Sequence, residues 1–189
     1  LVSQITVNNY EGTRMATRHL ISLGHRELMF LGGRDSSVTH RRRHQGFLAA
    51  AAAAANVHYD IFTILSGSKI EDGYHTGLAY FTRCIEEKRP IATGILCISD
   101  HFALGVMQAA VETGVDIPGQ VSLIGFDDVS FASLPKIQLT TISQPKEEIC
   151  VAAVRTLEEL IAADGPAPIS CKTIEPVLVR RDTCGPPGR

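Results

Sequence analysis

Short apolar segments alternate along this chain with longer segments in which apolar residues recur at helical spacing. The short segments are rich in Ile, Leu, Val and Phe and predict buried strands at 28–31, 61–65, 94–98 and 121–126. The longer segments carry apolar side chains three and four positions apart and predict helices at 11–23, 41–55, 73–87 and 102–113. This alternation predicts an α/β fold: a parallel sheet with right-handed crossovers and helices on both faces.

The alternation changes after residue 126. A polar stretch over 127–139 predicts a loop, followed by a short extended segment at 140–143 and a helix at 146–163. A loop at 164–168 leads to a final strand at 172–179, and we expect the tail from 184 to be frayed. Gly24 and Gly114 stand where helices end, and Asp100 stands where we expect the N-cap of helix 102–113.

The composition favours a globular domain over a disordered chain, a free-standing nucleic-acid module or a membrane-spanning protein. Of the 189 residues, 44% are hydrophobic, which is enough for a sizeable core. The net charge is −2, whereas a free-standing nucleic-acid module usually carries a basic excess. No apolar run approaches the roughly 18 residues that cross a bilayer. The first seven residues contain no basic residue and resemble a strand rather than a signal peptide, so we expect a piece of a longer protein.

The five cysteines are odd in number, widely spaced and never arranged as Cys-x-x-Cys. This pattern indicates reduced thiols in a cytoplasmic protein rather than a disulfide framework or a zinc site. We expect Cys97 and Cys150 to be buried, as small apolar residues of the core.

Polar residues follow the end of each predicted strand. In a parallel sheet these ends meet at one edge, where ligands bind. The segment after 31 supplies Thr39 and the basic run that ends in Arg43, and the later strands lead to Ser68, Ser99 and Asp127. A guanidinium can donate two parallel hydrogen bonds and a carboxylate can accept two, so this set suits a ligand rich in hydroxyl or amide groups.

The sequence motifs of common enzymes are missing. Gly32-Gly33 does not extend to the dinucleotide-binding pattern, and neither a phosphate-binding loop nor a Gly-x-Ser-x-Gly elbow is present. His40 and His44 are four residues apart and could share a helix face, but no third metal ligand accompanies them. We therefore expect no metal, no cofactor and no catalytic activity, and a Rossmann-like enzyme remains the least favoured reading.

An ordered set of motifs resembles the effector-binding core of the LacI/GalR family of bacterial transcription regulators. The resemblance covers about 7–181. The matching segments are Val7-Asn8-Asn9-Tyr10-Glu11-Gly12, Leu23-Gly24-His25-Arg26, Phe30-Leu31-Gly32-Gly33, Arg43-His44-Gln45-Gly46-Phe47, Ser99-Asp100-His101-Phe102-Ala103, Gly125-Phe126-Asp127-Asp128 and Thr141-Ile142-Ser143-Gln144-Pro145. Each motif alone is weak, whereas their order along the chain is specific.

The resemblance implies a two-lobed fold of the type I periplasmic-binding-protein kind, with the effector held between the lobes. It places 1–8 and 145–165 in the N-terminal lobe, 9–144 and a final strand within 166–181 in the C-terminal lobe, and 182–189 in a tail. The lobe crossovers are expected near Asn9, Gln144 and 165–168. The family's helix-turn-helix domain, which binds operator DNA, has no counterpart in this chain.

The resemblance also implies roles for particular residues. Arg43 and Asp127 match the effector-contacting Arg and Asp of the family. Ser99 stands where the family usually has Asn, and Ser68 where it often has an aromatic residue, so the effector class, sugar or nucleobase-like, stays open. We add Thr39 to this effector-binding set. The function implied is that of a homodimeric regulator whose lobe closure sets operator affinity. The alternative is a periplasmic sugar-binding protein of a transport system.

Overall fold

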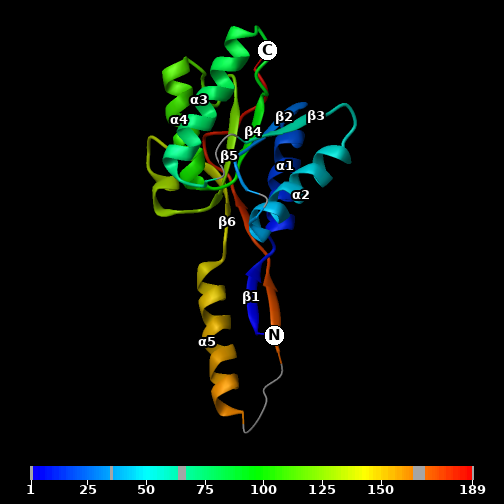
Figure 1. Cartoon of the computed structure of the whole chain (residues 1–189), viewed down its shortest axis with the longest axis vertical. Coiled ribbons are helices and arrows are strands. Elements are labelled where there is room, and N and C mark those ends of the chain that lie inside the picture. The colour runs from blue at the N-terminus through cyan, green and yellow to red at the C-terminus, as the bar shows by residue number, and fades with distance from the viewer. Residues whose placement is uncertain (1, 35, 64–66, 164–168, 189) are drawn as a thin grey trace.

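The computed structural model describes residues 2–34, 36–63, 67–163 and 169–188, and it consists of a body and a projecting arm (Figure 1). The body is built on a six-stranded sheet in the order β3-β2-β4-β5-β6-β8, in which β8 alone runs antiparallel to its neighbour. These strands are β2 (Glu27–Leu31), β3 (His58–Phe62), β4 (Gly94–Cys97), β5 (Ser122–Asp127), β6 (Thr140–Ser143) and β8 (Val177–Val179). The predicted α/β fold with a parallel sheet is therefore confirmed for five strands, and the antiparallel edge strand β8 departs from the prediction.

Two pairs of helices cover the two faces of this sheet (Figure 1). Helices α1 (Asn9–Ser22) and α2 (Val38–Ala52) pack together on one face, and α3 (Ile70–Glu86) and α4 (Asp100–Thr113) pack together on the other. The core between them is rich in aromatic rings at most 1% exposed: Phe30, Phe47, Phe81, Phe102 and Phe126. Burial of the sheet on both sides explains why its strands appear in the sequence as nearly continuous apolar runs.

The arm consists of β1 (Gln4–Val7), β7 (Cys171–Ile174) and α5 (Lys146–Ala162). The strands β1 and β7 form a separate parallel pair, and α5 contacts β1. The arm extends away from the body (Figure 1), and the apolar face of α5 is largely exposed at Val151, Val154, Leu157, Leu160 and Ile161. The prediction of a buried Cys150 is wrong for the same reason, because it lies on this uncovered helix, whereas Cys97 is buried.

The predicted single strand at 172–179, assigned with 166–181 to the C-terminal lobe, is wrong. The structure has two strands here, because β7 pairs with β1 in the arm and β8 pairs with β6 in the body. The chain crosses between the two sheets at Glu175 and Pro176, and proline cannot donate a hydrogen bond to continue a ladder. The crossover expected near 165–168 falls outside the described residues. Residues 64 and 65 of the predicted strand 61–65 also lie outside the described residues. The strand itself, β3, begins three residues earlier than predicted, at His58.

The chain after β8 is held on the body through Gly185, so the prediction of a frayed tail from 184 is wrong for Cys184 and Gly185. Thr183 is buried, donates to the Leu123 carbonyl at 2.7 Å and accepts from the Thr140 amide at 2.9 Å. Gly185 accepts hydrogen bonds from Ser122 and from buried His25. A polar tail packs because its donors and acceptors find partners at the amino ends of the strands.

The N-cap of α4 is Ser99 and not Asp100. The Ser99 side chain accepts from the Phe102 amide at 3.2 Å, while Asp100 is the first residue inside the helix. Both residue types cap helices well, so the sequence could not separate them. Among the described residues, no helix combines the length and apolar character that a membrane span requires.

Candidate functional site

Arg43 lies on α2 with its side chain in the interior of the body. Ser37 caps the helix by accepting from the His40 amide at 3.3 Å, which places Thr39 and Arg43 one turn apart on the same face. Arg43 is 5% exposed, its guanidinium carbon lies 3.6 Å from the centre of the Phe126 ring, and Nη1 donates to the Ile98 carbonyl. The aromatic face and the carbonyl hold the guanidinium at the carboxyl ends of β4 and β5.

Asp127, the last residue of β5, faces Arg43. Nη2 of Arg43 donates to Oδ1 of Asp127 at 3.1 Å, and Nε2 of Gln144 donates to the same oxygen at 2.5 Å. The second oxygen, Oδ2, accepts none of the hydrogen bonds found among the described residues. Asp127 and Asp128 both have positive φ, 118° and 50°, in a region that L residues rarely adopt. The backbone is thus held in a costly turn that presents this carboxylate.

Two of the three chain crossovers between body and arm bond directly to this ion pair, and the third bonds to the first crossover. Oδ1 of Asn9, at the first crossover, accepts from Nε of Arg43 at 2.8 Å, and Gln144 belongs to the second. Nδ2 of Asn8 donates to the Glu175 carboxylate of the third crossover at 2.8 Å. The sequence interpretation treated Asn9 and Gln144 only as crossover positions and missed them as part of the site. The signal available was that both lie inside the motifs that carry the resemblance.

A hollow of about 470 Å³ opens between the arm and the first turn of α2, and it is linked to the ion pair through Asn9, which lines the hollow and accepts from Arg43. Thr39 is exposed and lines this hollow, as do Asn9 and Tyr10 at the start of α1 and Arg42 on α2. Hydroxyl, amide and guanidinium groups therefore surround this space, while Arg43 and Asp127 lie outside its lining. The arrangement can hold a small polar molecule through several hydrogen bonds at once.

The two serines of the predicted set are placed differently. Ser99 is 6% exposed, and its hydroxyl donates to the Ser68 carbonyl at 3.0 Å while it caps α4. Its one proton is thus used, and a ligand could only donate to it. Ser68 is exposed and contributes its backbone to this contact. The structure joins Arg43 and Asp127 directly, whereas Thr39 only shares a helix face with Arg43, and Ser99 follows Ile98, whose carbonyl accepts from Arg43.

Burial shapes the electrostatics of the site. Desolvation lowers the pKa of Arg43 and the Asp127 carboxylate opposes this, so the guanidinium stays charged. Burial raises the pKa of Asp100, whose carboxylate accepts from Thr141 and from the Val129 amide at 2.9 Å. Through its bond to the Val129 amide, Asp100 fixes the turn that follows Asp127. Burial, with Arg43 nearby, lowers the pKa of His40 to about 4.

The histidines of α2 are engaged in local hydrogen bonds. His40 Nδ1 accepts from the Arg34 amide at 3.1 Å, and His44 Nε2 lies 2.9 Å from the Gly32 carbonyl. Within the described ranges, no group of three or more His, Cys, Asp or Glu side chains is arranged to hold a metal ion.

Comparison with known proteins places the chain among ligand-binding domains of transcription regulators. The family model of the periplasmic binding protein-like domain matches residues 17–184. The HTH-type transcriptional repressor PurR of Mannheimia succiniciproducens is 36% identical over 157 residues, which cover 82% of this chain and 45% of that protein. The chain thus spans about half the length of the curated relatives it matches.

Solved structures agree with this placement. A LacI-family regulatory protein from Corynebacterium glutamicum has a TM-score of 0.83 at 30% identity, covering 96% of this chain and 67% of that one. A periplasmic binding protein/LacI transcriptional regulator from Alkaliphilus metalliredigens, complexed with D-xylulofuranose, has a TM-score of 0.81 at 29% identity, covering 96% and 65%. The chain belongs to the LacI/GalR family, of which it holds most of the periplasmic-binding-protein-like core.

Proposed function

We propose that this chain is the effector-sensing part of a LacI/GalR-type transcription regulator. The observation that carries the proposal is that Arg43 and Asp127 bond to two of the three crossovers, through Asn9 and Gln144, and that Asn9 also lines a polar hollow. A ligand bound there contacts the residues that connect body and arm. The curated relatives, which are named as transcriptional regulators, favour this function over a transport protein. The proposal assigns the chain no catalytic step.

The ligand we propose is a small polyhydroxylated or nucleobase-like molecule. Asp127 offers Oδ2 as an acceptor, and three of the five guanidinium N–H groups of Arg43 are used internally, which leaves two donors. Thr39 and Asn9 add a hydroxyl and an amide. The relative from Alkaliphilus metalliredigens was solved with a pentulose, which supports a sugar. Ser68 supplies no aromatic face for stacking, which also favours a sugar over a base.

The mechanism we propose is a shift between two orientations of the arm relative to the body. Gln144 bonds to Asp127, so a ligand that engages Asp127 changes the environment of the second crossover directly. Such a ligand shifts the balance only by its difference in affinity for the two orientations. In the whole regulator, that shift would set operator affinity through a helix-turn-helix domain.

We further propose that the regulator is a cytoplasmic homodimer. Helices α3 and α4 and the segment after β5 carry exposed apolar side chains at Ile70, Val111 and Leu134, which are 38%, 83% and 50% exposed. Exposed apolar side chains of this size are available to bury in a subunit interface. The free cysteines fit a reducing compartment.

The test is a thermal-shift screen of pentoses, hexoses and purine bases, followed by calorimetric titration of the ligand found. We expect Arg43→Lys and Asp127→Asn each to weaken binding at least about tenfold, because each removes a charge-assisted hydrogen bond. Arg26→Lys and Asp182→Asn, on exposed residues outside the site, are the matched controls. Unchanged affinity in both site variants would contradict the site, and the absence of any ligand in this panel would contradict the ligand class.

A further inference from the structure

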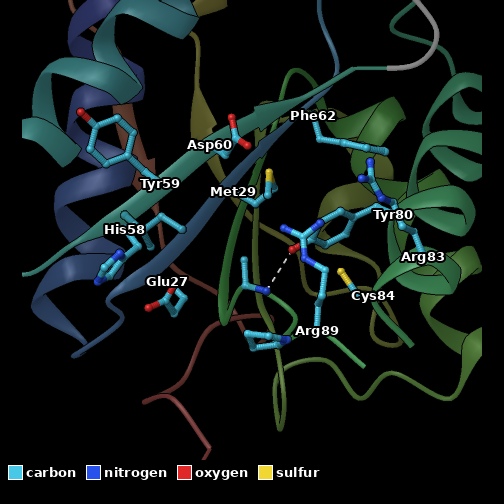
Figure 2. A pocket seen from close by; sticks show the side chains of 13 residues that line it. Glu27, Met29, His58, Tyr59, Asp60, Phe62, Tyr80, Arg83, Cys84 and Arg89 are labelled. Atoms are coloured by element: carbon cyan, nitrogen blue, oxygen red, sulfur yellow. Dashed lines mark hydrogen bonds between the residues drawn. The ribbon is translucent and has the colours of Figure 1, made fainter. Parts of the chain in front are cut away.

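A second cavity lies on the opposite side of the body from the effector site. Its volume is about 340 Å³, and it is lined by β2 from Glu27 to Met29, by β3 from His58 to Phe62 and by α3 (Figure 2). The effector site lies at the carboxyl ends of β4 and β5. Strand β3 is the outermost strand of the sheet, and α3 contacts β2, its inner neighbour. The face of the β2–β3 pair therefore forms a floor beside α3. No residue is shared between the two sites.

The floor of this cavity changes from polar to apolar along the strands. The register pairs Glu27 with His58 and Met29 with Asp60, and alternate residues of a strand face the same side. At the far end Phe62 meets Tyr80 of α3, with ring centres 5.5 Å apart. Tyr80 is 5% exposed and its hydroxyl accepts from the Ala92 amide at 3.0 Å, so this apolar end has a fixed wall.

The polar end of the floor carries two carboxylates with free acceptor capacity. Within the described part of the chain, the Glu27 carboxylate has no hydrogen-bond partner. Oδ1 of Asp60 accepts from the adjacent Ile61 amide at 2.7 Å, which leaves its other oxygen. The two residues are diagonal neighbours on adjacent strands. Two carboxylates in this position favour a ligand that brings a cation, such as an ammonium group.

The opposite rim carries two guanidinium groups. Nε of Arg83 donates to the Glu87 carboxylate at 3.0 Å, and Nη1 of Arg89 donates to the same carboxylate at 3.3 Å. Glu87 thereby holds both side chains at the rim while taking only one of the five N–H donors of each. The arginine side chains are 56% and 60% exposed, so the remaining donors are accessible to an anion.

We propose that this cavity binds a small zwitterion, an α-amino acid with a large apolar side chain. The carboxylate of the ligand would bond to the two arginines of the rim and its ammonium group to the two carboxylates of the floor. Its side chain would then lie against the apolar end of the floor, beside Phe62 and Tyr80. A ligand with only one of the two charges would leave the other set of charged groups uncompensated. This assignment does not depend on the proposed effector site.

The experiment compares three probes by calorimetric titration of the whole chain. L-phenylalanine carries both charges, 3-phenylpropanoate lacks the ammonium group, and phenethylamine lacks the carboxylate. We expect saturable binding of L-phenylalanine and at least about tenfold weaker binding of each analogue, because each loses charge-assisted hydrogen bonds. Equal binding of either analogue, or no saturable binding of L-phenylalanine up to millimolar concentration, would overturn the proposal.

Variants locate the binding on the molecule. Arg83→Gln and Asp60→Asn should each weaken binding of L-phenylalanine about tenfold. The matched controls are Lys88→Gln and Glu86→Gln, which remove exposed charges next to the cavity without altering its lining, and they should bind as the parent does. The proposal fails if the cavity variants bind as the parent does, or if Arg43→Lys abolishes binding, which would place the ligand in the effector site.

Discussion

At the scale of single residues, the ion pair of Arg43 and Asp127 could be anticipated, but its surroundings could not. Asp127 stands directly after a predicted strand, Arg43 lies in the first turn of the predicted helix 41–55, and both fall in motifs of the family. Two other features depend on the packing of distant segments. The Phe126 ring lies under the Arg43 guanidinium, and one oxygen of Asp127 accepts hydrogen bonds from both Arg43 and Gln144. The sequence shows which chemical groups a residue carries, whereas the fold determines which groups it contacts.

Ser99 shows how a plausible site residue can be diverted to a structural role. Its position after β4 matches the family's Asn, yet its hydroxyl caps α4 and donates to Ser68. An Asn side chain at this position is longer and carries two N–H donors and an acceptor oxygen, whereas the short Ser99 hydroxyl bonds only to nearby backbone groups. Its place in the effector-binding set therefore stays a prediction.

His40 makes the stability of the chain depend on pH. Burial lowers its pKa to about 4, and its neutral Nδ1 accepts from the Arg34 amide. The unfolded chain therefore takes up the proton first as pH falls below about 6.5, and the stabilising contribution is lost progressively between pH 6.5 and about 4. We expect the free energy of unfolding, measured with urea at pH 7, 6 and 5, to fall over this range.

The variant His40→Asn isolates this effect, because its side-chain oxygen can replace Nδ1 as an acceptor without titrating. We expect a shallower pH dependence, although not a flat one, because burial lowers the pKa of His19 and His25 as well. The same slope in the variant and the parent would show that His40 does not contribute.

At the scale of elements, the predicted helices exist but their ends differ. The α2 helix begins at Val38, three residues before the predicted start, because Ser37 caps it. It ends at Ala52 although alanines continue to 55, because the chain must turn through Asn56, at φ 56°, to enter β3. Intrinsic propensity favours a longer helix there, and the position of the next strand overrides it.

Gly46 permits the close packing of α1 and α2. A Cβ at this position would overlap the Tyr10 carbonyl, which belongs to the backbone of α1 and cannot rotate away. We expect Gly46→Ala to lower the free energy of unfolding by about 2 kcal/mol, despite the better helix propensity of alanine. Urea unfolding followed by circular dichroism measures this. Gln45→Ala, on the adjacent exposed residue, should change stability by less than about 0.5 kcal/mol. If Gly46→Ala were as stable as the parent, the two helices would not need this contact distance.

At the scale of the whole molecule, the arm is attached to the body mainly through its crossovers. Nη2 of Arg181 donates to the Asp128 carboxylate at 2.7 Å, and Nζ of Lys146 donates to the Asp128 carbonyl at the same distance. Lys146 and Gln144 thus connect the turn after β5 to the start of α5, while Arg181 fixes the same turn to the body segment after β8. The orientation of the arm is therefore coupled to the residues that we expect to contact a ligand.

The weak coverage of α5 predicts local mobility. Ala152 is the one buried residue of α5, whereas α4 has seven. We expect backbone amides of α5 to exchange with deuterium at least about a hundredfold faster than those of α4, because opening α5 exposes little apolar surface. Hydrogen exchange monitored by mass spectrometry measures both helices in one sample. Equal protection would mean that another surface, such as a second copy, covers α5 in solution.

The sequence by itself determined the alternation of strands and helices as far as α5, the α/β class and the family, because periodicity and motifs are local properties of the chain. Only the tertiary structure decided that the last predicted strand divides between two sheets, that the tail packs at Thr183, and that Asn9 and Gln144 join Arg43 and Asp127. These outcomes depend on contacts between residues far apart in the chain. Such contacts form between the hydrogen-bond donors, acceptors and apolar faces that are still without partners after the helices and strands have packed together.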